Sequence, residues 1–157
     1  MELTIRKYQQ ADHQAVCELH NKALKAANAH IGNGKWDDDL KDVEGVYLHP
    51  WGEFLVGTIN DQIVAMGALR KISDQKAEIK RMRVEPELQG KGYGQAILGH
   101  LERRARELGF TELQLDTMVI QVAAQRLYEK NGFREFRRAT LGGHECIFYE
   151  KKLATAE

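Results

Sequence analysis

The sequence has few cysteines and prolines, no net charge and no long apolar run, and each shortage excludes a class of protein. The two cysteines, Cys17 and Cys146, are too few for a disulfide framework and form no Cys-x-x-Cys pair. No uncharged stretch approaches the ~20 residues of a membrane-spanning helix. The 23 basic residues are balanced by 23 acidic ones, whereas a nucleic-acid-binding domain is usually strongly basic. We therefore expect no membrane and no nucleic-acid partner.

The rest of the composition is typical of a globular domain. The chain has 157 residues, of which 43% are hydrophobic, and ~100–200 residues are usual for one domain. No low-complexity linker or internal repeat divides it, so we expect one domain over residues 1–157. The first residues hold no apolar run of signal-peptide length, which predicts a cytoplasmic protein. The six histidines include no His-x-x-x-His pair, so we expect no bound metal.

Hydrophobic periodicity predicts strands first and alternating strands and helices later. Strands are expected near residues 3–8, 54–56, 63–66, 77–84, 113–115 and 147–149. The second and third of these flank Asn60-Asp61 and should form a hairpin. Helices are expected over 12–28 with Asp12 as N-cap, from Asp37 or Asp38 through residue 43, over 97–108, and over 123–128. This order predicts a mixed α/β domain.

A glycine-rich turn, Gln89-Gly90-Lys91-Gly92-Tyr93-Gly94, lies between a predicted strand and a predicted helix. Glycines let the backbone approach an anion closely, and the first N–H groups of a helix have no partner within it. The turn therefore predicts a phosphate-binding site, with a plain strand–helix loop as the alternative. It matches neither the G-x-x-x-x-G-K-[ST] pattern of a P-loop nor the G-x-G-x-x-G pattern of a dinucleotide-binding turn.

Three blocks of the sequence resemble the GNAT superfamily of N-acetyltransferases. Gln89-x-x-Gly92-x-Gly94 is similar to the family's Q/R-x-x-G-x-G/A signature. Residues 77–84 resemble its central strand, and residues 127–133 (LYEKNGF) resemble its second conserved block. The resemblance implies a GNAT-like fold, which is a twisted mixed sheet of about six or seven strands flanked by about four helices. It also implies binding of acetyl-CoA, with no metal.

The resemblance further implies which residues hold acetyl-CoA. Backbone N–H groups that bind the pyrophosphate would come from Gly90, Lys91, Gly92, Gly94 and Gln95. Gln89 would bracket this turn. Backbone groups of Met82 and Val84 would bind the pantetheine arm and the acetyl group, provided that their strand separates from its neighbour. Gln121 stands where many family members carry a cofactor-contacting asparagine, so this contact departs from the family pattern.

Two residues are expected to carry the chemistry. Tyr128 matches the family's general acid, which protonates the thiolate that the thioester expels; packing in the core is its alternative role. Glu78 matches a glutamate that serves as general base in some members. A base is needed because an amine with a pKa of ~10.4 is only about one part in several thousand neutral at pH 7. Glu78 belongs to a strand dense in charges and can instead pair with a neighbouring residue.

The resemblance implies direct transfer of acetyl to a primary amine in a ternary complex. Cys17 and Cys146 lie outside the motif region, so we expect no covalent enzyme intermediate. A non-catalytic acyl-CoA sensor and another kind of nucleotide-binding module are the alternatives. We expect a small-molecule acceptor, with polyamines, aminoglycosides, amino acids and protein amines all open, and a monomer or homodimer. Residues 31–50 should build the acceptor pocket, with Trp36, Tyr47 and Trp51 as candidate walls. The run Asp37-Asp38-Asp39 is either a solvated helix cap or an attractant for a cationic acceptor.

Overall fold

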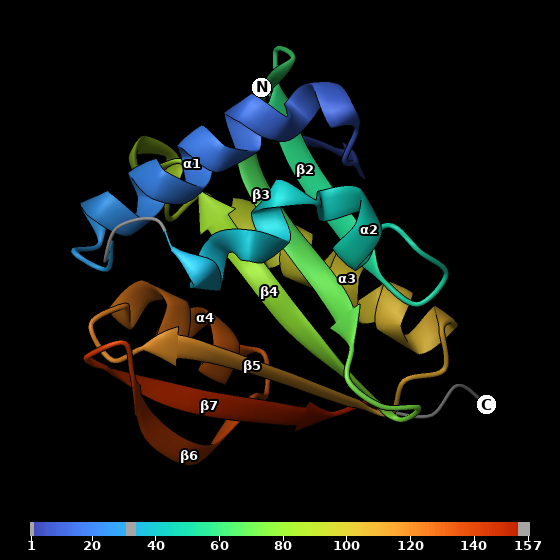
Figure 1. Ribbon diagram of the computed structural model, residues 1–157, viewed down its shortest axis with the longest axis vertical. Coiled ribbons are helices and arrows are strands. Elements are labelled where there is room, and N and C mark those ends of the chain that lie inside the picture. Colours follow the sequence, from blue (N-terminus) through green and yellow to red (C-terminus); the bar gives the residue numbers. More distant parts are fainter. Residues whose placement is uncertain (1, 31–33, 154–157) are drawn as a thin grey trace.

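The computed structural model describes residues 2–30 and 34–153, which form a mixed sheet of seven strands with helices on both faces (Figure 1). Across the sheet the strands follow the order β1-β2-β3-β4-β5-β7-β6. Their bounds are β1 Thr4–Lys7, β2 Glu53–Ile59, β3 Gln62–Lys71, β4 Lys76–Val84, β5 Glu112–Met118, β6 Arg134–Leu141 and β7 His144–Lys152. The predicted fold class is confirmed, and so is the hairpin that joins β2 to β3.

The helices cover the two faces of the sheet in sequence order. In Figure 1, α1 (His13–Ala26) and α2 (Val43–Tyr47) lie in front of the sheet, and α3 (Tyr93–Glu107) and α4 (Val122–Lys130) lie behind it. Single 3₁₀ segments are η1 (Gln10–Asp12), η2 (Lys35–Lys41) and η3 (Pro86–Leu88). Strands β2 and β3 are buried on both faces, because their alternate residues pack into two different hydrophobic clusters. The helices that carry the site pack against these two clusters.

Helix α3 packs closely on β3 at Gly67. A Cβ atom at this position would lie 2.6 Å from Cγ2 of Ile97 on α3 and 2.6 Å from Sδ of Met82 on β4. Ile97 is fully buried, so its side chain has little room to move. The absence of a side chain at Gly67 therefore sets how near α3 comes to the sheet, and with it the position of the glycine-rich turn that precedes α3.

Strands β4 and β5 are parallel neighbours, but they pair only at their first residues. Lys76, Ala77 and Glu78 are in register with residues 112–114, and no pair follows beyond them in the described ladder. Figure 1 shows the two strands diverging from this point. The separation that binding of a cofactor by Met82 and Val84 requires is therefore present.

A β-bulge at Arg81 decides which side chains of β4 face which helices. Arg81 has a positive φ of 59°, and the register between β3 and β4 shifts at this point. Because of the extra residue, Met82 and Val84 pack into the hydrophobic cluster behind the sheet. Arg83 instead turns towards α1, where it meets His20.

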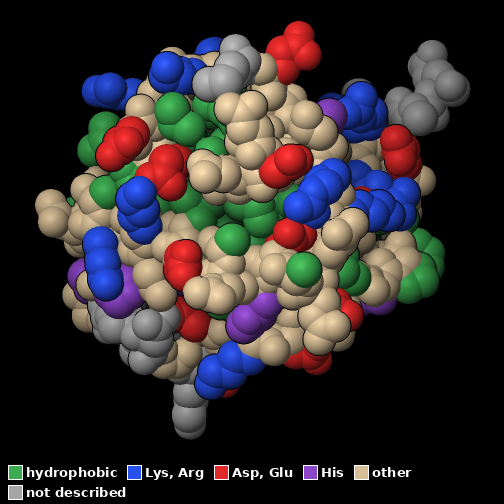
Figure 2. Space-filling view, turned by 90° about the horizontal axis from the view of Figure 1, so that it is seen from above, with side chains coloured by type: hydrophobic (Ala, Val, Ile, Leu, Met, Phe, Trp, Pro, Cys, Tyr) green, Lys and Arg blue, Asp and Glu red, His purple; other side chains and the backbone are tan. Residues whose placement is uncertain are grey.

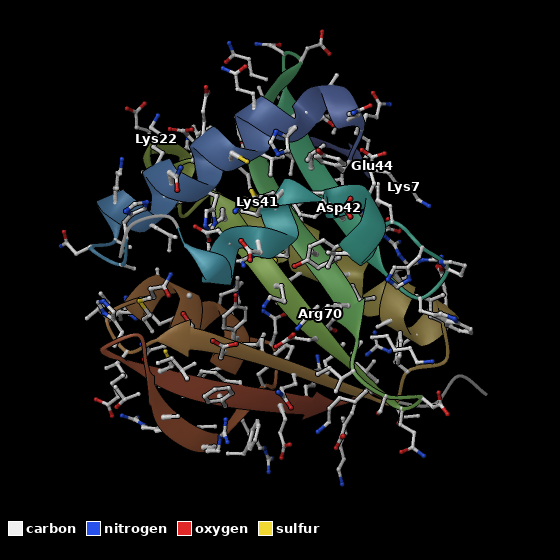
Figure 3. All side chains as sticks on the ribbon, in the orientation of Figure 1. Lys7, Lys22, Lys41, Asp42, Glu44 and Arg70 are labelled. Atoms are coloured by element: carbon white, nitrogen blue, oxygen red, sulfur yellow. The ribbon has the colours of Figure 1, made fainter. Side chains whose placement is uncertain are left out.

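Asp12 is the N-cap residue of α1 as predicted, but its side chain makes no capping bond, and the cap of α2 differs from the predicted one. Asp12 precedes α1, but its carboxylate accepts hydrogen bonds from Arg6, at 2.7 and 2.9 Å, and from the backbone N–H of Gln9. Helix α2 is capped by Asp42, which Figure 3 labels and which accepts from the N–H of Gly45 at 3.0 Å. A local sequence pattern could not foresee the ion pair with Arg6.

Two further expectations concern segments that local periodicity describes poorly. Strand β6 was not predicted, because nearly all of its side chains are exposed and its sequence shows no apolar alternation. The turn expected at residues 32–34 lies largely outside the described residues, and so does the side chain of Trp36.

The balanced charge of the chain is visible on its surface. Basic and acidic side chains are interspersed over the face seen in Figure 2, with hydrophobic side chains exposed between them. No helix within the described ranges is both long and apolar enough to cross a membrane. Within residues 2–30 and 34–153, no three His, Cys, Asp or Glu side chains come together as a metal site would need.

Candidate active site

The glycine-rich turn leads into α3 with its backbone N–H groups uncovered. Gly90 and Gly92 have positive φ values of 81° and 86°, and Gly92 is the N-cap of α3 without any side-chain cap. The first helical hydrogen bond at this end runs from the N–H of Ala96 to the carbonyl oxygen of Gly92. The preceding N–H groups of the helix have no partner among the described residues. Together with the helix dipole, they form a site for an anion.

A cavity of about 630 Å³ extends from this turn between β4 and α4. Its lining includes Met82 and Val84 on β4, which are expected to bind the pantetheine arm and the acetyl group. It also includes Gln121, which precedes α4. Of the predicted turn residues, it contains Gln89, Gly90, Gly92, Gly94 and Gln95. Lys91 is exposed and does not line the cavity. The structure thus brings together all but one of the residues expected to hold the cofactor.

A second cavity, of about 380 Å³, opens on the α1 side of the sheet. It shares with the first cavity the residues Met82, Arg83, Gln121, Ala124 and Tyr128. The two cavities therefore adjoin where β4 and β5 have separated. Such a junction lets a ligand from one side meet a ligand from the other.

Tyr128 lies at this junction. Its side chain comes from α4, is only 5% exposed, and packs against the rings of Phe133 and Tyr149 at centroid distances of 5.8 and 6.2 Å. Its hydroxyl makes no hydrogen bond to any described residue, although it borders both cavities. Burial raises the pKa of Tyr128 to about 12, so the phenol keeps its proton at neutral pH. Tyr128 thus both packs in the core and offers a free O–H to the cavities.

Glu78 lies where β4 and β5 begin to separate, and it lines neither cavity. It belongs to the last residue pair of β4 with β5, and its carboxylate accepts a 2.7 Å hydrogen bond from Arg70 of β3, which Figure 3 labels. The pairing with a strand neighbour, which the sequence left as an alternative, is therefore present.

Asp116 lines the second cavity, as does Asp37, and it was not singled out from the sequence. It lies on β5 beyond the point where that strand leaves β4. Although the side chain of Asp116 is exposed, partial loss of solvation beside its neighbours raises its pKa, and the charge of Glu78 raises that pKa further. The only sequence signal is a charged residue between the buried Leu115 and Thr117 of one strand.

A chain of polar contacts links η2, α1 and β4 beside the second cavity. Asp37 accepts from Nε2 of His20 at 2.9 Å, and Nε of Arg83 donates to Nδ1 of the same ring at 3.3 Å. Burial, and then the charges of Arg83 and Arg81, lower the pKa of His20 to about 4. The ring is therefore neutral at pH 7, with its proton on Nε2 because Nδ1 accepts. None of these partners is near the others in sequence.

The acidic run 37–39 is largely paired within the protein. Nε of Arg81 donates to Asp39 at 2.8 Å, Tyr47 donates to the same carboxylate at 2.5 Å, and Asp37 lies 3.7 Å from Arg81. Only Asp38 is exposed. Two of the three carboxylates thus neutralise a buried arginine. They are neither solvated helix caps nor free to attract a cationic acceptor.

The candidate aromatic walls are not where the sequence placed them. Tyr47 is fully buried in the core against Phe54, and Trp51 is half-exposed beneath Lys71. Neither lines the second cavity. Among described residues of the 31–50 segment, only Asp37 does so; most of the lining comes from α1, β4, β5 and the β6–β7 turn. The described residues of that segment therefore contribute to the cavity far less than expected.

Comparison with known proteins gives this fold and site a family. The chain is similar to an acetyltransferase of the GNAT family from Staphylococcus aureus Mu50, with a TM-score of 0.89, 22% identity, and coverage of 98% of this chain and 100% of the other. It is also similar to the PaiA N-acetyltransferase of Thermoplasma acidophilum in complex with coenzyme A, with a TM-score of 0.78, 21% identity, and coverage of 98% and 100%. These likenesses show an acetyltransferase fold of the GNAT type.

Sequence comparison identifies the family itself. The chain is 32% identical to N-acetylaspartate synthetase of Danio rerio over 98 residues, which are 61% of this chain and 35% of that protein. It is 28% identical to N-acetyltransferase 8F1 of Rattus norvegicus over 102 residues, 62% of this chain and 46% of that protein. The chain thus spans about a third to a half of the length of these relatives. The model of the Acetyltransferase (GNAT) family matches residues 13–133, and the chain belongs to that family.

Proposed function

We propose that the protein is an acetyl-CoA-dependent N-acetyltransferase that passes acetyl from the thioester directly to a primary amine in a ternary complex. The observation that carries this proposal is the junction of two cavities at Tyr128. One cavity begins at an anion site and suits a pyrophosphate followed by a pantetheine arm. The other, which is lined by α1, β4 and β5, meets the first at Tyr128 and suits the amine.

The turn has the space that a pyrophosphate needs. A Cβ atom added at Gly90 or Gly92 would meet no atom within 4 Å, so the surface above these glycines is open. Gln121 lines the same cavity as the glycine-rich turn. Its carboxamide oxygen accepts from Thr117 and from the N–H of Met118, both at 3.0 Å, which leaves the amide NH₂ to contact the cofactor in place of the family's asparagine.

Tyr128 is proposed as the general acid. The amine nitrogen attacks the thioester carbonyl, a C–N bond forms, and the C–S bond breaks. Counted from the neutral amine, the nitrogen loses one proton and the sulfur gains one, so the transfer itself consumes no net proton. The further proton that an ammonium group gives up beforehand passes to the solvent through the base. The phenol of Tyr128, which is neutral at pH 7 and has no partner among the described residues, is placed to donate the proton that the sulfur gains.

For the base, Glu78 is proposed to act through Asp116. Glu78 is held by Arg70 and lines neither cavity, whereas Asp116 borders the cavity of the acceptor. The charge of Glu78 raises the pKa of Asp116, which makes that carboxylate a stronger base. Asp116 would then attract the ammonium group and accept its proton, directly or through water.

Ligand binding and kinetics test this proposal against the two alternatives. Acetyl-CoA at 100 times its dissociation constant should stabilise the fold by ~2.7 kcal/mol, while NAD and ATP should not. Amine-dependent release of thiol would exclude a sensor, which binds CoA without turnover. Intersecting initial-rate lines, with no acetyl on acid-quenched protein, would support the ternary complex. Parallel lines together with acetylated protein would contradict it.

A further inference from the structure

The guanidinium of Arg83 borders both cavities and forms no ion pair with a described residue. Its Nε donates to His20 at 3.3 Å and its Nη1 donates to the carbonyl oxygen of Met82 at 2.8 Å. Nη2 donates to no described residue, and no carboxylate of the described chain lies within 4.0 Å of the guanidinium. Arg81, two residues earlier on β4, differs in forming an ion pair with Asp39.

Two carboxylates act on Arg83 through their charge: Asp37, which is engaged with other partners, and Asp116 on β5, which lies beyond ion-pair distance. Asp37 contacts His20 and lies near Arg81, and Asp39 is bound by Arg81 and Tyr47. Burial, and then the charge of Arg81, lower the pKa of Arg83 to about 10, which still leaves it cationic at pH 7. An enclosed charge that is hydrogen-bonded only to neutral groups is unfavourable, so an arginine kept in this state fits a site that an anion completes.

The surroundings also fix the direction of the guanidinium. His20 is neutral and is itself held by Asp37, so it can anchor Nε of Arg83 without competing for the ligand. The Met82 carbonyl anchors Nη1. The remaining N–H groups then form a preorganised edge, and the planar guanidinium matches the geometry of a carboxylate.

Charges on the cavity wall match an amine that carries a carboxylate. Lys80 lines the same cavity as Arg83 and forms no ion pair with a described residue. Asp116 supplies a carboxylate from β5, the strand that diverges from β4. One wall thus suits a negative group and the other suits an ammonium. The pyrophosphate has its own site at the glycine-rich turn, and Arg83 turns to the α1 side, away from the apolar side chains of β4.

We propose that Arg83 binds a carboxylate of the acceptor, and that the acceptors are amino acids. This proposal rests on the N-acetyltransferase function proposed above and narrows its substrate class. His20 and Asp37 are positioning residues in this arrangement, because they act on the acceptor only through Arg83.

Matched acceptors test the proposal. Thiol release would be measured with a panel of amino acids, the amide of each and the decarboxylated amine of each. Wild-type kcat/KM should be about 10- to 100-fold higher for the amino acids, the value of one charge-assisted contact. Arg83→Gln should remove that preference, mainly by raising KM for the amino acids. The kcat/KM values for the amides and simple amines should stay within about threefold of wild type. Arg83→Lys should restore part of it, and Arg103→Gln, on the exposed face of α3, should behave as wild type.

The outcomes separate this proposal from the function on which it rests. A wild-type enzyme that acetylates amides and simple amines as well as amino acids would overturn the carboxylate site while the acetyltransferase function stands. An equal fall in kcat for every amine in Arg83→Gln would overturn it too, since Arg83 would then stabilise the reacting group. If Arg83→Gln does not fold, the preference of the wild-type enzyme for amino acids over their amides and decarboxylated amines tests the proposal by itself. Acetyl-CoA binding without thiol release for any amine would refute both proposals.

Discussion

Gln95 and Asn131 exchange two hydrogen bonds through their side-chain amides, at 2.8 and 2.7 Å. Gln95 belongs to the first turn of α3, beside the glycine-rich turn, and Asn131 ends α4, the helix of Tyr128. Asn131 also donates to the carbonyl oxygen of Leu127, so its orientation is fixed. The anion site and the proposed general acid are therefore held by one pair of joined helices.

Removal of the Tyr128 hydroxyl should slow turnover and spare cofactor binding. Tyr128→Phe keeps the ring contacts with Phe133 and Tyr149 and loses only the O–H. We expect kcat to fall about 10²- to 10⁴-fold, the range of general-acid catalysis, with the dissociation constant of acetyl-CoA nearly unchanged. Tyr149→Phe is the matched control, because its hydroxyl contacts only Glu129, at 3.5 Å, among the described residues. Weaker acetyl-CoA binding with normal kcat would make Tyr128 a binding residue.

Alanine at two glycines should have opposite effects on stability. Gly92 has a φ of 86°, and alanine there should cost about 1–2 kcal/mol of unfolding free energy and weaken acetyl-CoA binding, measured by denaturation and titration. Gly99 lies within α3, where an added Cβ would meet no atom within 4 Å. Gly99→Ala should therefore stabilise the protein by up to about 1 kcal/mol through helix propensity and leave binding unchanged. Normal acetyl-CoA affinity in a folded Gly92→Ala protein would contradict the placement of the pyrophosphate.

Acid should destabilise the fold through His20. Its pKa in the folded protein is about 4, below the ordinary value of 6.5, so the unfolded chain takes up the proton first. The contribution of His20 to stability is complete above about pH 6.5 and falls as the pH drops towards 4, by about 3 kcal/mol in total. Urea unfolding at pH 7 and pH 4.5 should show a smaller loss in His20→Gln than in wild type. His49→Gln, at an exposed site, should keep the wild-type loss; the same loss in all three proteins would argue against this role.

The charge of Glu78 should be visible in the pH dependence of the reaction. Because Glu78 raises the pKa of Asp116, Glu78→Gln should lower that pKa and move the acid limb of the kcat/KM profile to lower pH. Glu112→Gln, at the start of β5 where the carboxylate lies 3.5 Å from Lys76, should leave the limb in place. A loss of kcat/KM at every pH, without any shift of the limb, would instead make Glu78 the base itself.

The sequence predicted the parts of the site that depend on local pattern. The glycine-rich turn and Tyr128 each lie within a short block, where the backbone needs of a turn or a helix act over a few residues. Arg83 and His20 could not be recognised as partners, because 63 residues separate them and the bulge at Arg81 decides which way Arg83 points. The acidic run was misjudged for the same reason, since Asp39 meets Arg81 only in the folded chain.

The most direct test of the account is the stoichiometry of a quenched reaction with acetyl-CoA and a panel of amines. Thiol release and the acetylated amine, followed by mass spectrometry, should rise together in a ratio of one to one. Neither product should form without an amine, and both should form about 10²- to 10⁴-fold more slowly with Tyr128→Phe. Tight binding of acetyl-CoA with no acetylated amine would contradict transfer at the junction of the two cavities.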